Sequence, residues 1–255
     1  MNSTKTQRDW LSLQKKLNSL TTEILLFVIT FIAGSIFLFL NINKERSLKI
    51  LLSFSGAFLF GLTILHFLPD LFLEYVPAYG LFVLIGFSIQ LILEFLTQGI
   101  DHGHYHKGAL NKVKLPALIG LFLHALFEAT PLASSHTHEE NENHFHESFF
   151  LGLILHKLPV AIVLASMLKH YLGRTSKSFF ILALFALMAP LGLLLSDSIP
   201  IFQHYQHYFM AIVIGIFLNI STTILFEISE NHKFNLVKFV SIVVGFSVAG
   251  LFSLL

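Results

Sequence analysis

Side chains with metal-binding chemistry lie within two apolar runs of this chain. His124 and Glu128, four residues apart, belong to the run LPALIGLFLHALFEATPLA, and His156 belongs to the later run FFLGLILHKLPVAIVLASML. Positions i and i+4 of a helix lie on one face, so an imidazole and a carboxylate at this spacing can bind one cation together. A histidine from a neighbouring helix can complete the site. The pattern predicts a divalent-metal site halfway across a membrane.

The apolar surroundings of these residues argue for a function. A charged carboxylate at the centre of a bilayer costs about 3 kcal/mol, so an intramembrane acid or histidine is by default a functional-site hypothesis. The alternative is a neutral histidine hydrogen-bonded to a protonated acid, a pair that would only join two helices. Pro131 and Pro159 lie just beyond the predicted ligands, and two successive runs carry the same kind of residue. Both observations favour metal binding.

The composition is that of an integral membrane protein. Of the 255 residues, 55% are apolar and 12% are charged, and the mean hydropathy is +0.74; soluble chains are about one quarter charged. The net charge of +1 gives no indication of nucleic-acid binding. Because the chain has no cysteine, disulfides and thiolate metal sites are excluded. A metal must therefore be held by nitrogen and oxygen.

Eight apolar runs are long enough to cross about 30 Å of hydrocarbon. Backbone groups in lipid must be satisfied within their own segment, so we expect helices. The sequence predicts an all-α integral membrane protein with about eight transmembrane helices in a single transport domain, residues 24–255. The runs are approximately Ile24–Leu40, Ile50–Phe72, Tyr79–Leu96, Leu115–Ala133, Phe149–Leu168, Phe179–Leu195, Tyr208–Phe226 and Leu236–Leu255.

The basic residues of the loops predict the orientation. They follow the first, third, fifth and seventh runs, whereas the loops after the second, fourth and sixth runs have no Lys or Arg. Cytoplasmic loops are enriched in basic residues, so we expect both termini outside, in a plasma or inner membrane. Residues 1–23 are predicted to form an amphipathic, basic lead-in without the cleavage site of a signal peptide. It is either an interfacial helix on the outer face or part of a further, weakly apolar segment.

Two loops are rich in histidine. The loop over residues 101–107 is predicted to be cytoplasmic, and the loop over residues 136–147 is predicted to face outward and is also acidic. Imidazoles and carboxylates in a loop raise the local concentration of divalent cations; the alternative is that both loops are solvated linkers. The candidate metal-capture residues are His102, His104 and His106 in the first loop and His136, His138, His144 and His146 in the second.

Other polar residues inside the runs are candidates for an ion pathway. His66 and Asp70 form a second i, i+4 pair near the outer end of the second run, where a helix-end histidine and a capping acid are the alternative. Asn219, in the seventh run, is either a pathway ligand or an interhelical hydrogen-bonder. Glu227 closes the seventh run as an exit-path acid or a solvated terminus. Glu94, beside Gln90 in the third run, is another functional acid or a solvated helix end.

The chain resembles the ZIP (Zrt/Irt-like) divalent-metal transporters over all eight runs. The resemblance is carried by HFLPD in the second run, HALFEA in the fourth, HKLPVA in the fifth and FALMAPLG in the sixth, with a His-rich loop after the third. It implies a homodimeric eight-helix transporter with outward termini that moves zinc, iron, manganese or similar ions toward the cytoplasm. It also implies a mid-membrane site built from the fourth and fifth helices, which slide as part of a mobile bundle against a dimer scaffold.

The sequence departs from the family pattern at positions that would hold a second metal. Ala125, Val160 and Ala189 stand where family members offer an amide or acid, and Lys157 stands where members with two metals present a carboxylate. An ammonium about 4 Å from a second divalent ion would cost about 8 kcal/mol at an effective dielectric near 20. We therefore expect one cation, held by His124, Glu128 and His156, with Lys157 as a substitute for the second metal.

The predicted function is transport of a divalent cation, zinc foremost, with no required cofactor and no catalysis. A metalloenzyme is the first alternative, but the HExxH signature is missing and no Ser/His/Asp set stands out. A haem-binding electron carrier is the second, with His124 and His156 as axial ligands. The acid one turn from His124 and the two His-rich loops favour ion handling.

The predicted orientation can be tested with single cysteines, because the chain has none of its own. A cysteine at Ser135 should react with an impermeant thiol reagent on intact cells, because its loop is predicted to face outward. A cysteine at Ser176 should react only after the membrane is permeabilised. The reverse labelling pattern would overturn the predicted topology.

Overall fold

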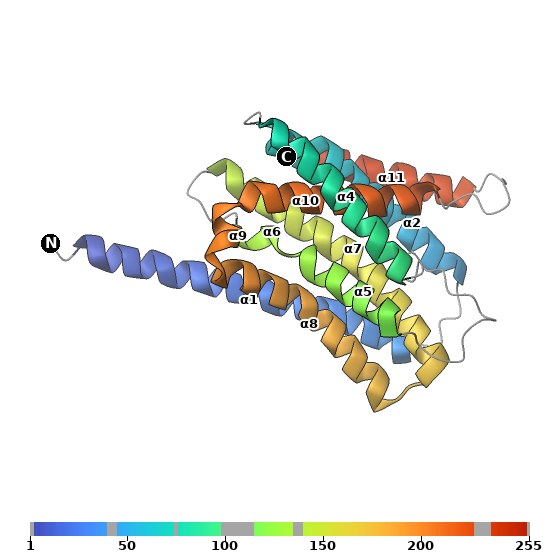
Figure 1. Ribbon diagram of the computed structural model, residues 1–255. Coiled ribbons are helices and arrows are strands. Elements are labelled where there is room, and N and C mark those ends of the chain that lie inside the picture. Colours follow the sequence, from blue (N-terminus) through green and yellow to red (C-terminus); the bar gives the residue numbers. More distant parts are fainter. Residues whose placement is uncertain are drawn as a thin grey trace.

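The computed structural model describes residues 3–39, 45–73, 76–97, 115–134, 140–226 and 236–253. Within these ranges every regular element is a helix, in agreement with the all-α prediction. Figure 1 shows their arrangement. The elements are α1 (Ser3–Phe39), α2 (Glu45–Leu62), η1 (Thr63–Phe67), α3 (Leu68–Leu71), α4 (Pro77–Thr97), α5 (Leu115–Phe127), α6 (Pro131–Ser134), α7 (Glu140–Leu172), α8 (Ser176–Ser198), α9 (Pro200–His204), α10 (Gln206–Phe226) and α11 (Leu236–Ser253).

Seven segments of the described chain are long and apolar enough to cross a membrane. They are Leu20–Phe39, Leu48–Leu71, Pro77–Leu96, Phe149–Leu172, Ser176–Ser198, Gln206–Phe226 and Leu236–Ser253. The protein is therefore a multi-pass membrane protein. Helix α1 runs without a break across the boundary expected between the lead-in 1–23 and the transport domain.

The fourth predicted span differs from expectation. The run Leu115–Ala133 is not one helix: α5 has 13 residues and ends at Phe127, and the four-residue helix α6 follows after a turn. Thirteen residues rise about 20 Å, less than the hydrocarbon thickness of about 30 Å. The prediction of eight full-length spans is thus corrected to seven candidate spans and one short apolar helix in the described part of the chain.

Pro131 explains where α5 ends. Proline has no backbone N–H, so it cannot donate to the carbonyl of Phe127, four residues earlier. The backbone N–H and the hydroxyl of Thr130 donate to that carbonyl instead, at 3.2 and 2.8 Å. The chain therefore turns at Glu128–Thr130, and the Phe127 carbonyl stays satisfied inside an apolar bundle.

The long helices pack as two groups (Figure 1). In the first helix group, α4 packs along α10, α11 packs along α2, and α10 contacts α2. In the second helix group, α1 packs against α7 and α8, and α5 packs against α8. The groups meet along two seams, between α2 and α7 and between α4 and α5, where the helices pack as extensively as α5 does against α8. The helices α5 and α7 of the second group thus lie against the first group.

The helices α4 and α10 touch backbone to backbone. A Cβ added at Gly86 would lie 1.9 Å from the carbonyl oxygen of Ile212, and one added at Gly215 would lie 2.0 Å from that of Val83. Glycine is the residue that permits such a close approach of two helices, and small residues commonly provide it between transmembrane helices. This contact joins α4 firmly to α10 within the first helix group.

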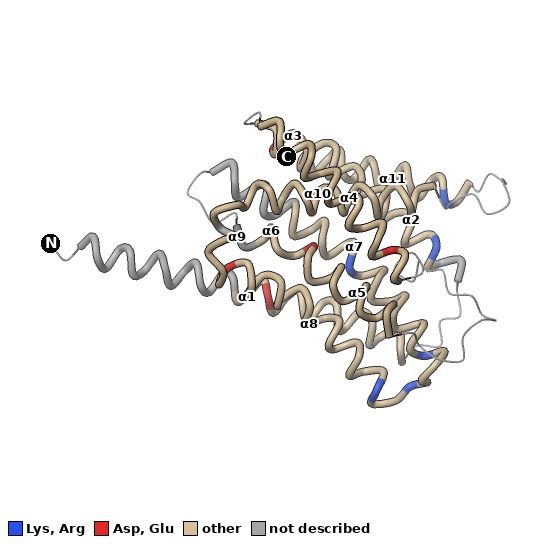
Figure 2. The backbone as a smooth tube through the Cα atoms, in the orientation of Figure 1, with Lys and Arg blue, Asp and Glu red and all other residues tan. Residues whose placement is uncertain are grey.

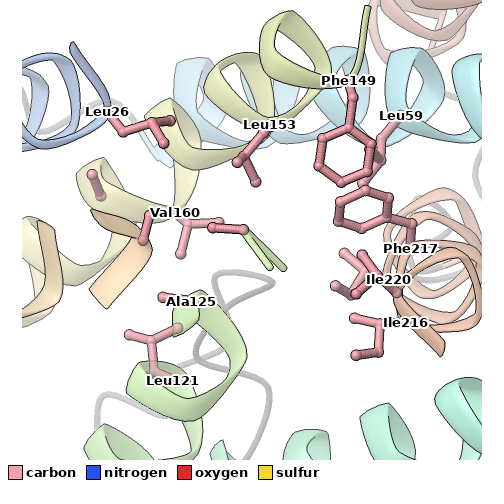
Figure 3. Close-up of a cluster of buried hydrophobic side chains, with 14 of the residues drawn as sticks. Leu26, Leu59, Leu121, Ala125, Phe149, Leu153, Val160, Ile216, Phe217 and Ile220 are labelled. Carbon is pink, nitrogen blue, oxygen red and sulfur yellow. The ribbon is translucent and has the colours of Figure 1, made fainter. Parts of the chain in front are cut away.

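A buried aromatic cluster fills the junction between the groups. Phe67 of η1, Phe149 of α7 and Phe217 of α10 are each 0–1% exposed, with ring centroids 5.1, 5.6 and 6.2 Å apart. Figure 3 shows Leu59, Phe149 and Phe217 together where α2, α7 and α10 meet. Phe149 precedes His156 by seven residues, about 10 Å along α7. The cluster therefore fills the interior of the bundle on the N-terminal side of His156 along α7.

The described basic residues gather at one end of the bundle, where α2 and α11 begin and α7 ends (Figure 2). Lys157, on α7, lies in the interior instead and is 2% exposed. The sorting of charge to one end agrees with the loop pattern of the sequence. That this end faces the cytoplasm stays a prediction.

Candidate metal centre

The three predicted metal ligands come together in the interior of the bundle. His124 lies in the last turn of α5, Glu128 lies in the turn that follows, and His156 lies in α7. Glu128 Oε2 is 3.4 Å from His124 Nε2 and 3.8 Å from His156 Nε2. One ligand atom from each residue lies within 4.8 Å of the others, and the three residues are 1–2% exposed. Within the described ranges, this is the one cluster of three or more His, Asp and Glu residues that could hold a metal.

These distances suit a single cation. Two ligand atoms held about 2.1 Å from one tetrahedral zinc ion are about 3.4 Å apart. The separations of 3.4 and 3.8 Å are at or slightly above this value, and the third pair of ligand atoms lies within 4.8 Å. In addition, His124 Nε2 and Glu128 Oε2 are buried and make no hydrogen bond to any described residue. Buried polar atoms normally have a partner, and a cation between these atoms would provide one.

Lys157 provides the positive charge next to Glu128. Its Nζ donates a short hydrogen bond to Glu128 Oε1 and a second one, of 3.3 Å, to the carbonyl oxygen of Ala125. Nζ also lies 5.6 Å from the ring centroid of Phe185, within the range of a cation–π contact. The two oxygens of Glu128 therefore have different partners: Oε1 faces the ammonium of Lys157, and Oε2 faces the two imidazoles.

The local sequence explains why these side chains meet. His124 and Glu128 keep their helical i, i+4 relation, because the Glu128 N–H still donates to the His124 carbonyl oxygen at 3.1 Å. Although α5 ends at Phe127, this hydrogen bond keeps Glu128 in helical register with His124. Pro159 lies inside α7, three residues after His156. The site is thus built from the end of a short helix and from a proline-containing region of a long one.

One side chain in contact with the site, Gln90, was not among the residues predicted from the sequence to belong to it. Gln90 of α4 is 0% exposed, and its Oε1 lies 3.2 Å from His124 Nδ1. In the sequence, Gln90 stands four residues before Glu94 in the third predicted run. The available signal was an uncharged amide near the middle of an apolar run, which alone does not distinguish a helix-joining residue from a partner of the site.

The predicted pathway pair His66 and Asp70 lies apart from this cluster. His66 is in η1 and Asp70 in α3, with Nε2 and Oδ2 3.7 Å apart and side chains 18% and 32% exposed. Pro69 cannot donate to the Leu65 carbonyl, which accepts a hydrogen bond from the Ser253 hydroxyl instead, at 3.2 Å. A π-helical turn in a longer helix is frequently found at functional sites, but a role of the pair in transport stays a prediction.

The structure describes only some of the remaining predicted residues. Asn219, on α10, is 2% exposed and its Oδ1 has no hydrogen-bond partner among the described residues. Glu227 lies outside the described residues. The candidate capture histidines His102, His104, His106, His136 and His138 also lie outside them, as do the side chains of His144 and His146. Ala125, Val160 and Ala189, which depart from the family pattern, are 0–2% exposed in the apolar core.

No protein-family model matches the chain, and no curated protein matches it. The protein is a helical membrane protein with seven candidate spans, and a buried cluster of His124, Glu128 and His156 could hold a metal ion.

Replacing Lys157 with Met should destabilise the metal-free protein. The change removes the ammonium but leaves the buried Glu128 carboxylate, and removing one partner of a buried ion pair typically costs about 3–5 kcal/mol. Zinc supplies positive charge to the same carboxylate, so it should restore much of the loss. Thermal unfolding in detergent, with chelator and with zinc, measures both effects.

The exposed Lys177, replaced in the same way, is the matched control and should unfold like the unmodified protein. If Lys157→Met with chelator were as stable as the unmodified protein, Lys157 would not be the counter-charge of Glu128.

Proposed function

We propose that the protein is a transporter of divalent metal cations, zinc foremost, which carries the ion across the membrane through the site formed by His124, Glu128 and His156. One observation carries the proposal. Two imidazoles and a carboxylate converge at 3.4 and 3.8 Å in the interior of a membrane-crossing bundle. Ionisable residues are rare inside membranes and mark ion pathways when they are present.

The ligand set fits an ion that must be released again. Structural zinc sites are usually closed by four protein ligands, whereas this cluster offers three. Water or a further group would complete the shell. Nitrogen and oxygen ligands of this kind suit zinc best, and they also suit iron, manganese, cobalt and cadmium. Imidazole and carboxylate bind only when deprotonated, so uptake should fall at acidic pH.

Lys157 supports a site for one ion. Its ammonium would repel a second divalent cation at about 4 Å by about 8 kcal/mol, at an effective dielectric near 20. It also weakens the binding of the first ion, since the loaded site keeps a net positive charge. In the empty site, the Lys157–Glu128 pair has no net charge, which lowers the cost of keeping the carboxylate in the bundle. Lys157 thus takes the place of a second metal.

The two helix groups support a transport cycle in which one moves against the other. His124 and His156 lie on α5 and α7 of the second group, and Glu128 lies in the turn directly after α5. The resemblance of HALFEA and HKLPVA to ZIP motifs supports the same division into a mobile bundle and a dimer scaffold. We propose a homodimer in the plasma or inner membrane with outward termini. The outer acidic, His-rich loop would collect the cation, which then moves toward the cytoplasm.

The geometry disfavours the haem alternative. Glu128 Oε2 lies 3.4 Å from the Nε2 atom of one imidazole and 3.8 Å from that of the other. A carboxylate in this position would occupy the space in which a haem iron, with its macrocycle, would have to lie between two axial histidines. A small cation fits the same space without displacing the acid.

Uptake of zinc into proteoliposomes tests the proposal. The unmodified protein should give saturable uptake, and His124→Ala, Glu128→Ala and His156→Ala should each lower it to the level of protein-free vesicles, because each removes one of three ligands. The exposed His170, also on α7, provides the matched control, and His170→Ala should transport normally. Gel filtration confirms that each variant is folded.

Near-normal uptake by all three folded ligand variants would exclude the site. Absence of uptake by the unmodified protein, with any of the five candidate metals, would exclude the transport function itself.

A further inference from the structure

We propose that Gln90 is the positioning residue of the metal site: it holds His124 in the tautomer that binds the ion, and it links the site to the helix group against which the site moves. This inference rests on the proposed transport function and deepens it. Nothing in the family resemblance or in the sequence pattern assigns Gln90 a role.

The first step concerns the two nitrogens of His124. An amide oxygen can only accept, so the contact of 3.2 Å between Gln90 Oε1 and His124 Nδ1 requires that Nδ1–H donates. In a neutral imidazole the other nitrogen, Nε2, then carries the lone pair. Nε2 is the atom that faces Glu128 Oε2, at 3.4 Å. Gln90 thereby aims a metal-binding lone pair at the site.

The second step concerns the strength of binding. Metal-binding histidines almost always donate their other N–H to a carboxylate, a carbonyl or a water, and this contact fixes the ring and increases its basicity. Gln90 provides such an acceptor from a side chain that is 0% exposed, so water cannot easily replace it. Loss of the acceptor would leave a buried N–H without its partner and would free the ring to turn.

The third step concerns the position of Gln90 in the fold. His124 is on α5 of the second helix group, whereas Gln90 is on α4 of the first. The close contacts at Gly86 and Gly215 join α4 to α10, so in the proposed cycle α4 stays with α10 while α5 moves. The Gln90–His124 hydrogen bond therefore crosses the seam and must break in each transport cycle. Gln90 thus favours zinc binding while α4 and α5 are packed together, and it opposes the movement that separates them.

The chemistry of the side chain fits this double role. A glutamate would accept from Nδ1–H through a charge-assisted hydrogen bond, roughly twice as strong as a neutral one. It would hold the imidazole well but release it slowly. The neutral amide provides the same acceptor geometry with a bond that is weaker and easier to break.

Two substitutions separate the two roles in the full-length protein. Gln90→Met keeps the size of the side chain but removes the acceptor, and it should weaken zinc binding about 10–100-fold, with a matching rise in KM and no fall in maximal rate. Gln90→Glu keeps the acceptor and strengthens the bond, so it should bind zinc at least as tightly but lower the maximal rate about fivefold. Calorimetric zinc titration in detergent and uptake into proteoliposomes provide the two readouts.

The matched control is Leu93→Met, a buried α4 residue outside the site, which should change neither readout by more than about twofold. If the unmodified protein binds zinc but folded Gln90→Met binds it equally well, the positioning role is wrong. An unchanged maximal rate in Gln90→Glu would overturn the link between the groups, even if Gln90→Met fails to fold. If the unmodified protein neither binds nor transports a divalent cation, it is the proposed function that fails.

Discussion

The structure depends on the need of one buried carboxylate for positive charge. Glu128 is 1% exposed, with the Lys157 ammonium at Oε1 and the imidazoles of His124 and His156 at Oε2. An ionised carboxylate without a counter-charge in such an interior costs several kcal/mol. The lysine meets this need when no ion is bound, and a divalent cation adds to it on the other side of the carboxylate. The site can therefore be empty or loaded without a bare negative charge in the membrane.

The helices α4, α5 and α7 together position the side chains around Glu128. Pro131 prevents α5 from continuing past Phe127, and Thr130 satisfies the carbonyl that the proline leaves without a donor. The ligands thus lie at the end of a short helix and on α7, whereas Gln90 reaches them from α4, which is fixed to α10 by close glycine contacts. In the proposed cycle, the hydrogen bond between His124 and Gln90 would couple ion binding to the relative position of the two helix groups.

Much of this arrangement was predictable from sequence, and the reasons for the exceptions are physical. Run length and apolarity located seven spans, and the i, i+4 spacing correctly paired His124 with Glu128. The fourth span was predicted too long, because hydropathy does not register the effect of Pro131 on the helix. Gln90 was not recognised as part of the site, because its contact depends on how α4 and α5 pack, and an isolated amide carries no spacing signal. The roles of Lys157, of the pathway residues and of the histidine loops stay predictions.

Metal content combined with X-ray absorption at the zinc edge tests the central claim most directly. Purified protein saturated with zinc should hold one ion per chain, bound by imidazole nitrogen and carboxylate oxygen at about 2.0–2.2 Å. The imidazole contribution should decrease when His156 is replaced with Ala. Two zinc ions per chain, or one ion in a shell without imidazole, would contradict a single-ion site formed by His124, Glu128 and His156.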